Sequence, residues 1–590
     1  MFQSFQETAS PETGPIRLAA LRDVLRDRDL EGFIVPRADA HQGEYVAAHD
    51  ERLAWLTGFT GSAGFAVALR NRAAVFVDSR YRVQVKTQVS AEFEKIDWPE
   101  TGLGDWIAAA SPEGGRIGFD PWLHSVEQHR VLSKTMGKAT LVSVGNLVDE
   151  IWVDQPPAPM GKVFAQPLDL AGEPHGSKIE RLAKDLRADA CVITLPDSIA
   201  WLLNIRGSDI PRNPVPHGFA ILYADATLSV YMHAAKLSEV RDGFGERVRI
   251  HSPETLTEHL GQIAGTVQID PATCPFALQQ ALSCKIVEAP DPCLLPKACK
   301  NAAELAGARA AHLRDAAAMV RFLAWLDKEA PGSLTEIAVV RRLEEERRAT
   351  NALRDISFET ISGSGPNGAI VHYRVTEKTD RALRAGELLL VDSGGQYVDG
   401  TTDITRTLAI GDPGPREAEA FTRVLRGMIA LSRLRFPKGL AGRDIDPFAR
   451  VALWEAGLDY GHGTGHGVGS YLSVHEGPAR IARVGKVPLE PGMILSNEPG
   501  FYEEGSFGIR IENLIVVETA PPLPGQTVSQ MLRFETLTWV PIDLTLVIPS
   551  LMTQAERDWL NGYHAEVLER VGPLVNEADR EWLKTACRAI

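Results

Sequence analysis

The sequence predicts a three-domain chain in which two copies of one α/β unit precede a mixed α+β domain. Three observations support this prediction. A WLx4GS signature occurs twice, a Pro-rich stretch lies between the two occurrences, and short strands alternate with Gly, Pro and Asp turns in the C-terminal half. A chain of 590 residues also exceeds what one hydrophobic core usually supports, so several domains are expected.

Each of the two copies has the pattern of a helix, a strand, the signature and two further strands. In the first copy these elements are expected at 16–28, 32–36, 55–62, 66–69 and 73–78. In the second copy they are expected at 178–188, 191–196, 201–208, 219–222 and 228–232. The signature tryptophans, Trp55 and Trp201, are expected to anchor the two cores. With DQPPAPMGK (154–162) as the linker, the predicted domains are 1–160, 161–297 and 298–590.

The third domain begins with helical patterns over 300–330 and 335–348. Another helix is expected over 421–436, and the chain ends in helices over 553–571 and 577–587. Between these helices lie apolar runs typical of buried strands.

Composition excludes several classes of protein. The net charge of −15 repels phosphate backbones, so we expect no nucleic-acid partner. No run of 18 apolar residues exists, so we expect no membrane span, and the first 15 residues have the composition of a frayed polar tail without a signal peptide. Six cysteines without a CxxC motif indicate reduced thiols in a cytoplasmic protein.

Two apparent motifs are set aside. GSGPNG (363–368) fits the dinucleotide fingerprint GxGxxG, but a proline interrupts it and the strand-like AIVHY follows, where the fingerprint requires a helix. His462 and His466 have the spacing of a zincin pair. Their run, GHGTGHGVG, is too rich in glycine to hold a helix, so a metal-binding loop or strand edge is favoured.

Four acidic residues stand in otherwise apolar strand patterns of the third domain: Asp392, Asp403, Glu498 and Glu512. A lone carboxylate is costly to bury in such a place, and any single one could be a satisfied structural acid. Four together are better explained by a shared cation. Four carboxylates with a neutral His466 carry four negative charges, which two divalent cations balance. An oxygen-rich donor set with one imidazole suits manganese, cobalt or magnesium-like ions.

The motifs around these acids resemble one family. VDSGGQYVDGTTDITRT, HGTGHGVGSYLSVHEGP, SNEPGFY and FGIRIEN are similar to the aminopeptidase P family of pita-bread metallopeptidases, and most similar to its large, three-domain cytosolic form. GPNGAIVHY, IAWLLNIRGSDIP and DAHQGEYVA extend the resemblance over nearly the whole chain. The fold it implies is two tandem creatinase-N-like α/β domains followed by a C-terminal pita-bread catalytic domain.

The resemblance implies a role for each motif residue. Asp392 would bind one metal, Asp403 and Glu512 would bridge two, and His466 and Glu498 would complete the second metal. The implied metals are two manganese ions. Glu498 would also move the proton of the nucleophilic water.

The remaining implied roles concern substrate and support. His372 would bind near the scissile peptide, His475 would stabilise the oxyanion, and His462 would lie on the substrate side. Arg510 would orient Asp392, and Arg80, from the first domain, would contact substrate. The chain departs from the resemblance at Arg374, where similar proteins often have a smaller or apolar residue.

The implied activity is hydrolysis of the N-terminal Xaa-Pro bond by a metal-bridged hydroxide, in a homodimer. Proline removes the amide N–H and fixes φ, which makes this bond a poor substrate for ordinary aminopeptidases. Two enzyme alternatives remain: a prolidase restricted to Xaa-Pro dipeptides, and a metal-free creatinase-like amidinohydrolase, which the five ligands argue against. A catalytically silent peptide-binding scaffold is the alternative from another class.

Overall fold

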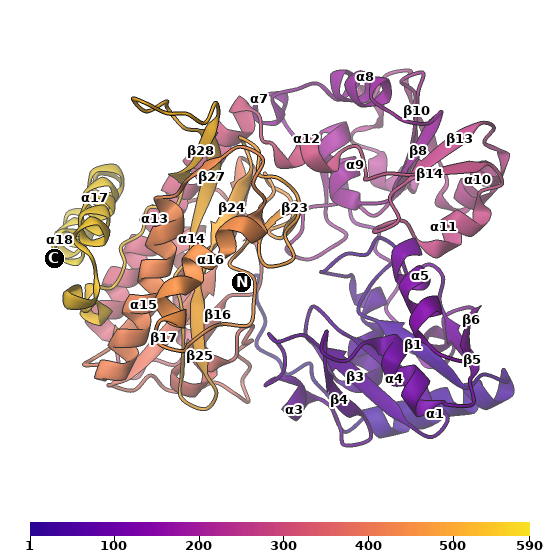
Figure 1. Cartoon of the computed structure of the whole chain (residues 1–590), viewed down its shortest axis with the longest axis horizontal. Helices are drawn as coiled ribbons and strands as arrows, with labels where there is room; N and C mark the ends of the chain where they lie inside the picture. Colours follow the sequence, from indigo (N-terminus) through magenta and orange to yellow (C-terminus); the bar gives the residue numbers. More distant parts are fainter. The chain divides into compact units, whose positions relative to one another are not determined.

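The computed structural model describes residues 1–590, which divide into two units (Figure 1). One unit is Thr8–Leu294, and the other is Leu295–Ile590 together with Met1–Glu7. We call the second the catalytic unit, because it holds the residues for which the sequence predicts a catalytic role. None of the helices combines the length and the apolar character that crossing a bilayer requires.

The unit Thr8–Leu294 contains two six-stranded sheets built to one plan, with strand orders β4-β3-β2-β1-β5-β6 and β12-β11-β10-β8-β13-β14. The first sheet consists of β1 (Gly32–Pro36), β2 (Phe65–Leu69), β3 (Ala73–Val77), β4 (Glu94–Asp97), β5 (Gly115–Phe119) and β6 (Ala139–Ser143). The second consists of β8 (Ala190–Ile193), β10 (Phe219–Tyr223), β11 (Leu228–Tyr231), β12 (Val248–His251), β13 (Thr266–Ile269) and β14 (Lys285–Glu288).

The pairing of strands repeats in detail between the two sheets. In each, the first strand pairs antiparallel with the second and parallel with the fifth, and the third and fourth strands pair in parallel. The predicted helices are α1 (Gly14–Asp27) and α8 (His175–Lys184). This shared topology confirms the prediction of two copies of one α/β unit.

The signature tryptophans lie on short helices, α2 (Arg52–Thr57) and α9 (Pro196–Leu203). Trp201 is buried, as expected of a core anchor. Trp55 is only partly buried, and its ring stacks on Trp152 with centroids 5.4 Å apart. The aromatic signature therefore supports both cores, from the interior in one copy and from the rim in the other.

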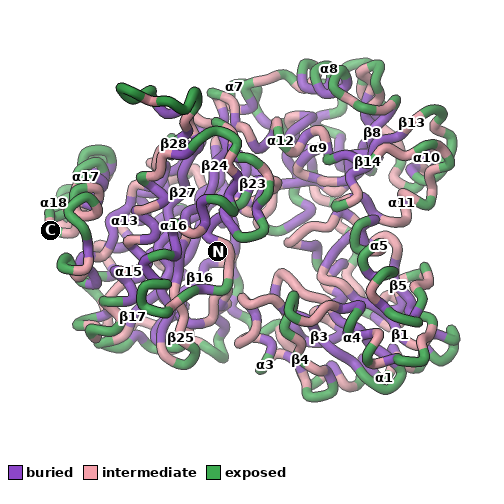
Figure 2. Tube along the Cα trace, in the orientation of Figure 1, coloured by how far each residue is buried: buried purple, intermediate pink, exposed green.

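Strands lie at the centre of the catalytic unit, with helices around them (Figure 1). Its long helices are α13 (Ala302–Glu329), α14 (Glu336–Arg348), α15 (Pro415–Ser432), α16 (Gly442–Trp454), α17 (Gln554–Val571) and α18 (Glu577–Ala586). α13 begins where sequence predicts, because Asn301 and Glu304 form a reciprocal capping box. Helices α13, α15 and α17 share one apolar core with β17, and Figure 2 shows buried chain concentrated there.

The strands of the catalytic unit form several sheets. One has the order β16-β17-β20, with β16 (Ile361–Ser364), β17 (Glu387–Ser393) and β20 (Ile404–Ile410). Another has the order β21-β28-β27-β24-β22-β23, with β21 (Arg435–Pro437), β22 (Gly465–Gly467), β23 (Glu476–Ile481), β24 (Ile494–Asn497), β27 (Asn513–Thr519) and β28 (Met531–Thr536). The remaining pairings involve β15 (Leu353–Ile356), β18 (Gly395–Tyr397), β19 (Gly400–Thr401), and the hairpin of β25 (Gly500–Glu503) and β26 (Phe507–Arg510).

The expectation that all four acids lie within strands is wrong for three of them. Asp392 lies in β17, but Asp403 immediately precedes β20 and Glu498 immediately follows β24. Glu512 lies between β26 and β27, so the strand pattern around it is divided into two strands. The reason is that β26 pairs with β25, whereas β27 pairs with β24 and β28 in a different sheet. The chain changes sheets at Glu512.

Two further expectations are also wrong. The strand-like pattern AIVHY is not a strand, because a 3-10 helix occupies Gly365–Ala369 and irregular chain follows. The polar N-terminal tail is not frayed over its first residues. Gln3 and Phe5 are buried within the catalytic unit, where Phe5 joins an apolar cluster with Ile337. The buried phenylalanine is hidden in a segment of otherwise polar composition.

Candidate active site

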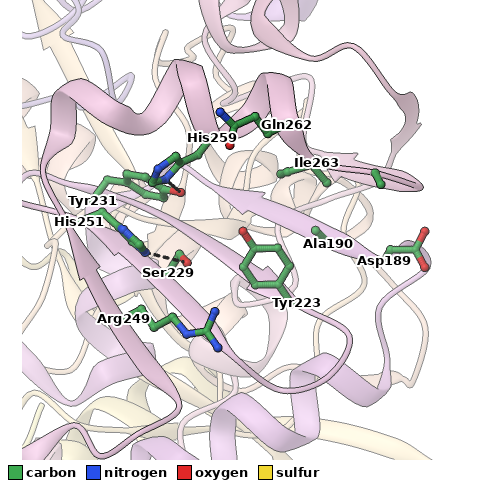
Figure 3. Close-up of a pocket in the computed structure, with 11 residues that line it drawn as sticks. Asp189, Ala190, Tyr223, Ser229, Tyr231, Arg249, His251, His259, Gln262 and Ile263 are labelled. Atoms are coloured by element: carbon green, nitrogen blue, oxygen red, sulfur yellow. Dashed lines mark hydrogen bonds between the residues drawn. The ribbon is translucent and has the colours of Figure 1, made fainter.

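A hollow of about 360 Å³ lies on the second six-stranded sheet (Figure 3). Several of its polar side chains pair with one another. The Tyr231 hydroxyl lies 2.9 Å from Nδ1 of His259, and Ser229 Oγ lies 3.2 Å from Nε2 of His251. None of the residues that the motifs single out lines this hollow. The candidate site lies in the catalytic unit instead.

Strand ends from different sheets bring the predicted metal ligands together. One ligand atom each from Asp403, His466 and Glu512 lie within 4.8 Å of one another. Nε2 of His466, on β22, is 3.5 Å from Oδ2 of Asp403 and 3.4 Å from Oε1 of Glu498. His466 therefore lies on a strand edge, as its glycine-rich run indicates, and not on a zincin helix. Asp392 is linked to Glu512 by hydrogen bonds that run through Arg510 and Thr405.

Three carboxylate oxygens at this site are buried and accept no hydrogen bond. They are Oδ1 of Asp392, Oδ1 of Asp403 and Oε1 of Glu512. Buried carboxylate oxygens normally have partners, because an unpartnered one loses its hydration without compensation. Oxygen ligands of this kind suit hard divalent cations, so the donor set fits a metal centre.

The electrostatics of the group also favour cations. Burial, and then the charges of Asp403 and Glu498, raise the pKa of Glu512 well above its ordinary value. Burial likewise raises the pKa of Asp392, although Arg510 opposes the shift. Burial lowers the pKa of His466, but Asp403 and Glu498 outweigh it and raise that pKa to about 9. The buried carboxylates therefore stabilise positive charge at this site. Bound divalent cations would supply that charge, and His466 could then be a neutral ligand.

Arg510 ties the acids to their surroundings. Its Nη2 lies 2.6 Å from Oδ2 of Asp392, and its Nε donates to Thr405 Oγ1 at 3.2 Å. Thr405 in turn donates its hydroxyl to Oε2 of Glu512 at 2.8 Å. The Arg510 side chain is 2% exposed, so these contacts form away from solvent. The contact expected between Arg510 and Asp392 is present.

Tyr502, which sequence reasoning missed, contacts two of the predicted site residues. Its hydroxyl accepts from Nη1 of Arg510 at 2.6 Å and lies 2.9 Å from Nε2 of His462. The only sequence signal is its place in the SNEPGFY motif. The hairpin brings Tyr502 near Arg510 because Gly500 on β25 pairs with Arg510 on β26. A chain of contacts thus runs from His462 through Tyr502 and Arg510 to Asp392.

His475 and His372, the other two predicted histidines, lie in segments that buried contacts hold in place. The ring of His475 is centred 4.2 Å from that of His466. Its neighbour Glu476 is buried between two lysine ammonium groups, with Lys297 at 2.9 Å and Lys300 also in contact. His372 lies in the irregular chain before β17, where Nη2 of Arg510 donates to the preceding carbonyl, Val371 O, at 3.3 Å.

Arg80 belongs to the other unit, whereas the remaining predicted site residues belong to the catalytic unit. Its guanidinium forms ion pairs with Asp78 at 2.7 Å and Glu44 at 3.6 Å. Burial opposes its charge, but Tyr81, Asp78 and Glu44 together raise the pKa of Arg80. It is a fixed cation with 23% of its side chain exposed.

Comparison with known proteins bears on all parts of the chain. The model of metallopeptidase family M24 matches residues 306–519, and that of the C-terminal region of peptidase M24 matches 530–590. Models of the creatinase/prolidase N-terminal domain match residues 17–151 and 154–304. The order of these matches follows the two repeated sheets and the catalytic unit.

Full-length relatives and a solved structure agree with these matches. Aminopeptidase P1 of Arabidopsis thaliana is 36% identical, over 97% of this chain and 99% of the relative. A probable Xaa-Pro aminopeptidase P of Paracoccidioides lutzii is 39% identical over the same shares. The crystal structure of an X-prolyl aminopeptidase from Caenorhabditis elegans, described as a cytosolic enzyme with a di-nuclear active site, matches with a TM-score of 0.92 and 34% identity. It covers 98% of this chain and 100% of that one.

Proposed function

The chain belongs to the Xaa-Pro aminopeptidases of metallopeptidase family M24, and on this premise we propose which of its residues carry the reaction and which metal they hold. Its substrates are peptides with proline in the second position, from which it releases the N-terminal residue. Its full-length relatives are aminopeptidases, which favours this activity over that of a dipeptide-only prolidase or a silent scaffold.

Asp392, Asp403, His466, Glu498 and Glu512 are proposed to hold two manganese ions. The observation that carries this assignment is the three buried carboxylate oxygens without a hydrogen-bond partner, on Asp392, Asp403 and Glu512. Asp403 and Glu512 also converge with His466. The family resemblance implies that Asp403 and Glu512 would each be shared by both ions, and their ligand atoms lie within 4.8 Å of each other and of one from His466. When bound, such a metal pair lowers the pKa of water and polarises a peptide carbonyl.

The protein groups around the metals have distinct proposed tasks. Glu498 accepts the proton of the attacking water and passes it to the proline nitrogen as the bond breaks. Ser496, whose Oγ donates to Oε1 of Glu498 at 3.1 Å, orients that carboxylate. His475, beside His466, donates to the oxyanion, and His372 holds the substrate near the scissile bond. His462 contacts the substrate side and is oriented by Tyr502.

One assay tests this function and its metal. An Xaa-Pro-Pro tripeptide and an Xaa-Pro dipeptide are incubated with the protein, after chelation and after addition of Mn²⁺. We expect cleavage of the tripeptide, loss of activity with chelator, recovery with Mn²⁺, and two manganese ions per chain by elemental analysis. Cleavage of the dipeptide alone, or recovery by Zn²⁺ and not Mn²⁺, would contradict the proposal.

Arg80 is proposed to bind the substrate from the first domain. Replacing it with methionine removes a fixed guanidinium, and a charge-assisted hydrogen bond is worth about 1.5–3 kcal/mol. We expect KM for the tripeptide to rise about tenfold while kcat stays within about twofold. Arg72→Met, which removes a more exposed arginine paired with Glu94, is the matched control. If the two variants had the same KM and kcat, the proposed substrate-binding role of Arg80 would be wrong.

Assembly, compartment and domain limits are also proposals. We infer a homodimer, for which light scattering should give twice the 64.4 kDa chain mass. A cytosolic location is supported by the description of the C. elegans enzyme and by six cysteines that form no disulfide. Domain limits near 160 and 297 are supported by the positions of the repeated sheets, and limited proteolysis would test them.

A further inference from the structure

The first seven residues, Met1–Glu7, form a segment that we call the N-terminal strap, and it is seated within the catalytic unit. The Gln3 side-chain amide both donates a hydrogen bond to the backbone of Thr360 and accepts one from it. Nε2 of Gln3 donates to Thr360 O at 3.2 Å, and Thr360 N donates to Oε1 of Gln3 at 2.8 Å. Phe5 is 6% exposed and packs with Ile337 and Tyr373. The two hydrogen bonds of Gln3 and the buried ring of Phe5 fix the strap in one position.

The carboxylate of Glu344 accepts from the Phe2 amide of the strap at 2.9 Å. Arg374 binds the strap farther along the chain. Its Nη1 donates to Gln6 O at 2.9 Å, and its Nη2 donates to Ser4 O at 2.9 Å. Its Nε donates to Glu359, which holds the guanidinium in place. A guanidinium presents several donors in one plane, so it can grip two carbonyls at once, which a smaller or apolar side chain cannot do.

The strap contacts the segment that carries His372. We call residues 371–377 the His372 segment, and it has no helix or strand of its own. On one side, Arg510 donates to the carbonyl of Val371 at 3.3 Å, which ties the segment to the metal ligands. On the other side, two contacts tie the segment to the strap: Arg374 donates to Ser4 and Gln6, and the Glu377 amide donates to Phe5 O at 2.8 Å. Because the segment lacks a backbone ladder, its conformation depends on contacts of this kind, to which the Tyr373 hydroxyl adds a bond to Glu336 at 2.9 Å.

We propose that the N-terminal strap positions His372 for the reaction, and that Arg374 is the positioning residue through which the strap acts. This inference rests on the proposed role of His372 at the scissile bond. A displacement of a substrate-binding group by about 1 Å can cost about 10²-fold in rate, so a loosened segment lowers turnover without touching the metals. Residues 1–7 thus contribute to the reaction although none of them is proposed to contact the substrate.

A double-mutant cycle tests the catalytic consequence. Arg374→Met is expected to lower kcat for the Xaa-Pro-Pro tripeptide about tenfold, with two metals still bound. In a His372→Ala background it is expected to have no further effect, because both changes remove the same contribution. Arg384→Met, an exposed arginine of the same stretch of chain, is the control and should leave kcat unchanged. An equal loss in both backgrounds, or no loss in the single variant, would overturn the proposal.

Hydrogen exchange tests the strap separately from the role of His372. In Arg374→Met and in Gln3→Ala, the amides of residues 371–377 should exchange about tenfold faster, whereas Arg384→Met should not change them. Unchanged exchange in both strap variants would refute positioning. Wild-type activity of His372→Ala would instead refute the proposed function of His372, and the exchange result would still decide whether the strap holds the segment.

Discussion

Glu512→Gln is expected to abolish metal binding and to lower kcat/KM by about 10³-fold or more. The substitution keeps the shape of the side chain and removes one negative charge. Oε1 of Glu512 has no hydrogen-bond partner, so its proposed partners are the metals, and a neutral amide is a poor bridge between two cations. The measurement combines steady-state kinetics with elemental analysis of the purified variant.

The stability of the same variant separates loss of the site from loss of the fold. Burial and the neighbouring acids raise the pKa of Glu512, so its charged form is disfavoured in metal-free protein. We therefore expect metal-free Glu512→Gln to melt no lower than the metal-free wild type. Mn²⁺ should raise the Tm of the wild type and leave that of the variant unchanged. Glu518→Gln, on the exposed end of β27, is the control that should behave as wild type. Full metal content in Glu512→Gln would remove it from the ligand set.

Arg510→Met is expected to have the second largest effect, because it removes the cation that holds Asp392. Leaving that carboxylate buried and unpaired should destabilise the metal-free protein by about 3–5 kcal/mol. Loss of the orienting contact should also weaken metal binding by about 10–100-fold. Denaturant titration of the metal-free protein and competitive Mn²⁺ titration measure the two effects.

Two further variants show whether geometry or charge matters at this position. Arg510→Lys keeps the charge but cannot reach Asp392, Tyr502 and Thr405 together, so we expect little recovery. Arg533→Met removes an exposed arginine paired with Glu518 and should cost less than about 1 kcal/mol. If Arg510→Lys restored both stability and metal affinity, charge alone would explain the role of Arg510.

Much of the architecture could be predicted from local pattern. The strand at 32–36 and the start of the long helix at Asn301 are found where expected, because hydrophobic periodicity and capping chemistry act over a few residues. The metal ligands could be proposed from charges that are costly in apolar runs. The roles of individual ligands were available only through the resemblance to a family, and they remain predictions for the experiments above.

Other features depend on which distant segments meet. The break at Glu512 arises because its two flanking strands pair in different sheets, and local alternation continues straight through that point. Tyr502 becomes part of the site only when the hairpin places it against Arg510. The seat of Phe5 is formed by residues more than 300 positions away, which leave no periodic signal in a polar N-terminal sequence.

The sequence by itself therefore determined the repeated units, most elements and the chemical identity of the acids and histidines. Each of these follows from residue type and from spacing within one strand or helix. The tertiary structure alone decided which carboxylate oxygens lack partners, which side chains hold Arg510, and where the N-terminal strap binds. These depend on long-range packing, since a buried polar atom is satisfied or left unpartnered only by what the rest of the fold brings within about 3 Å of it.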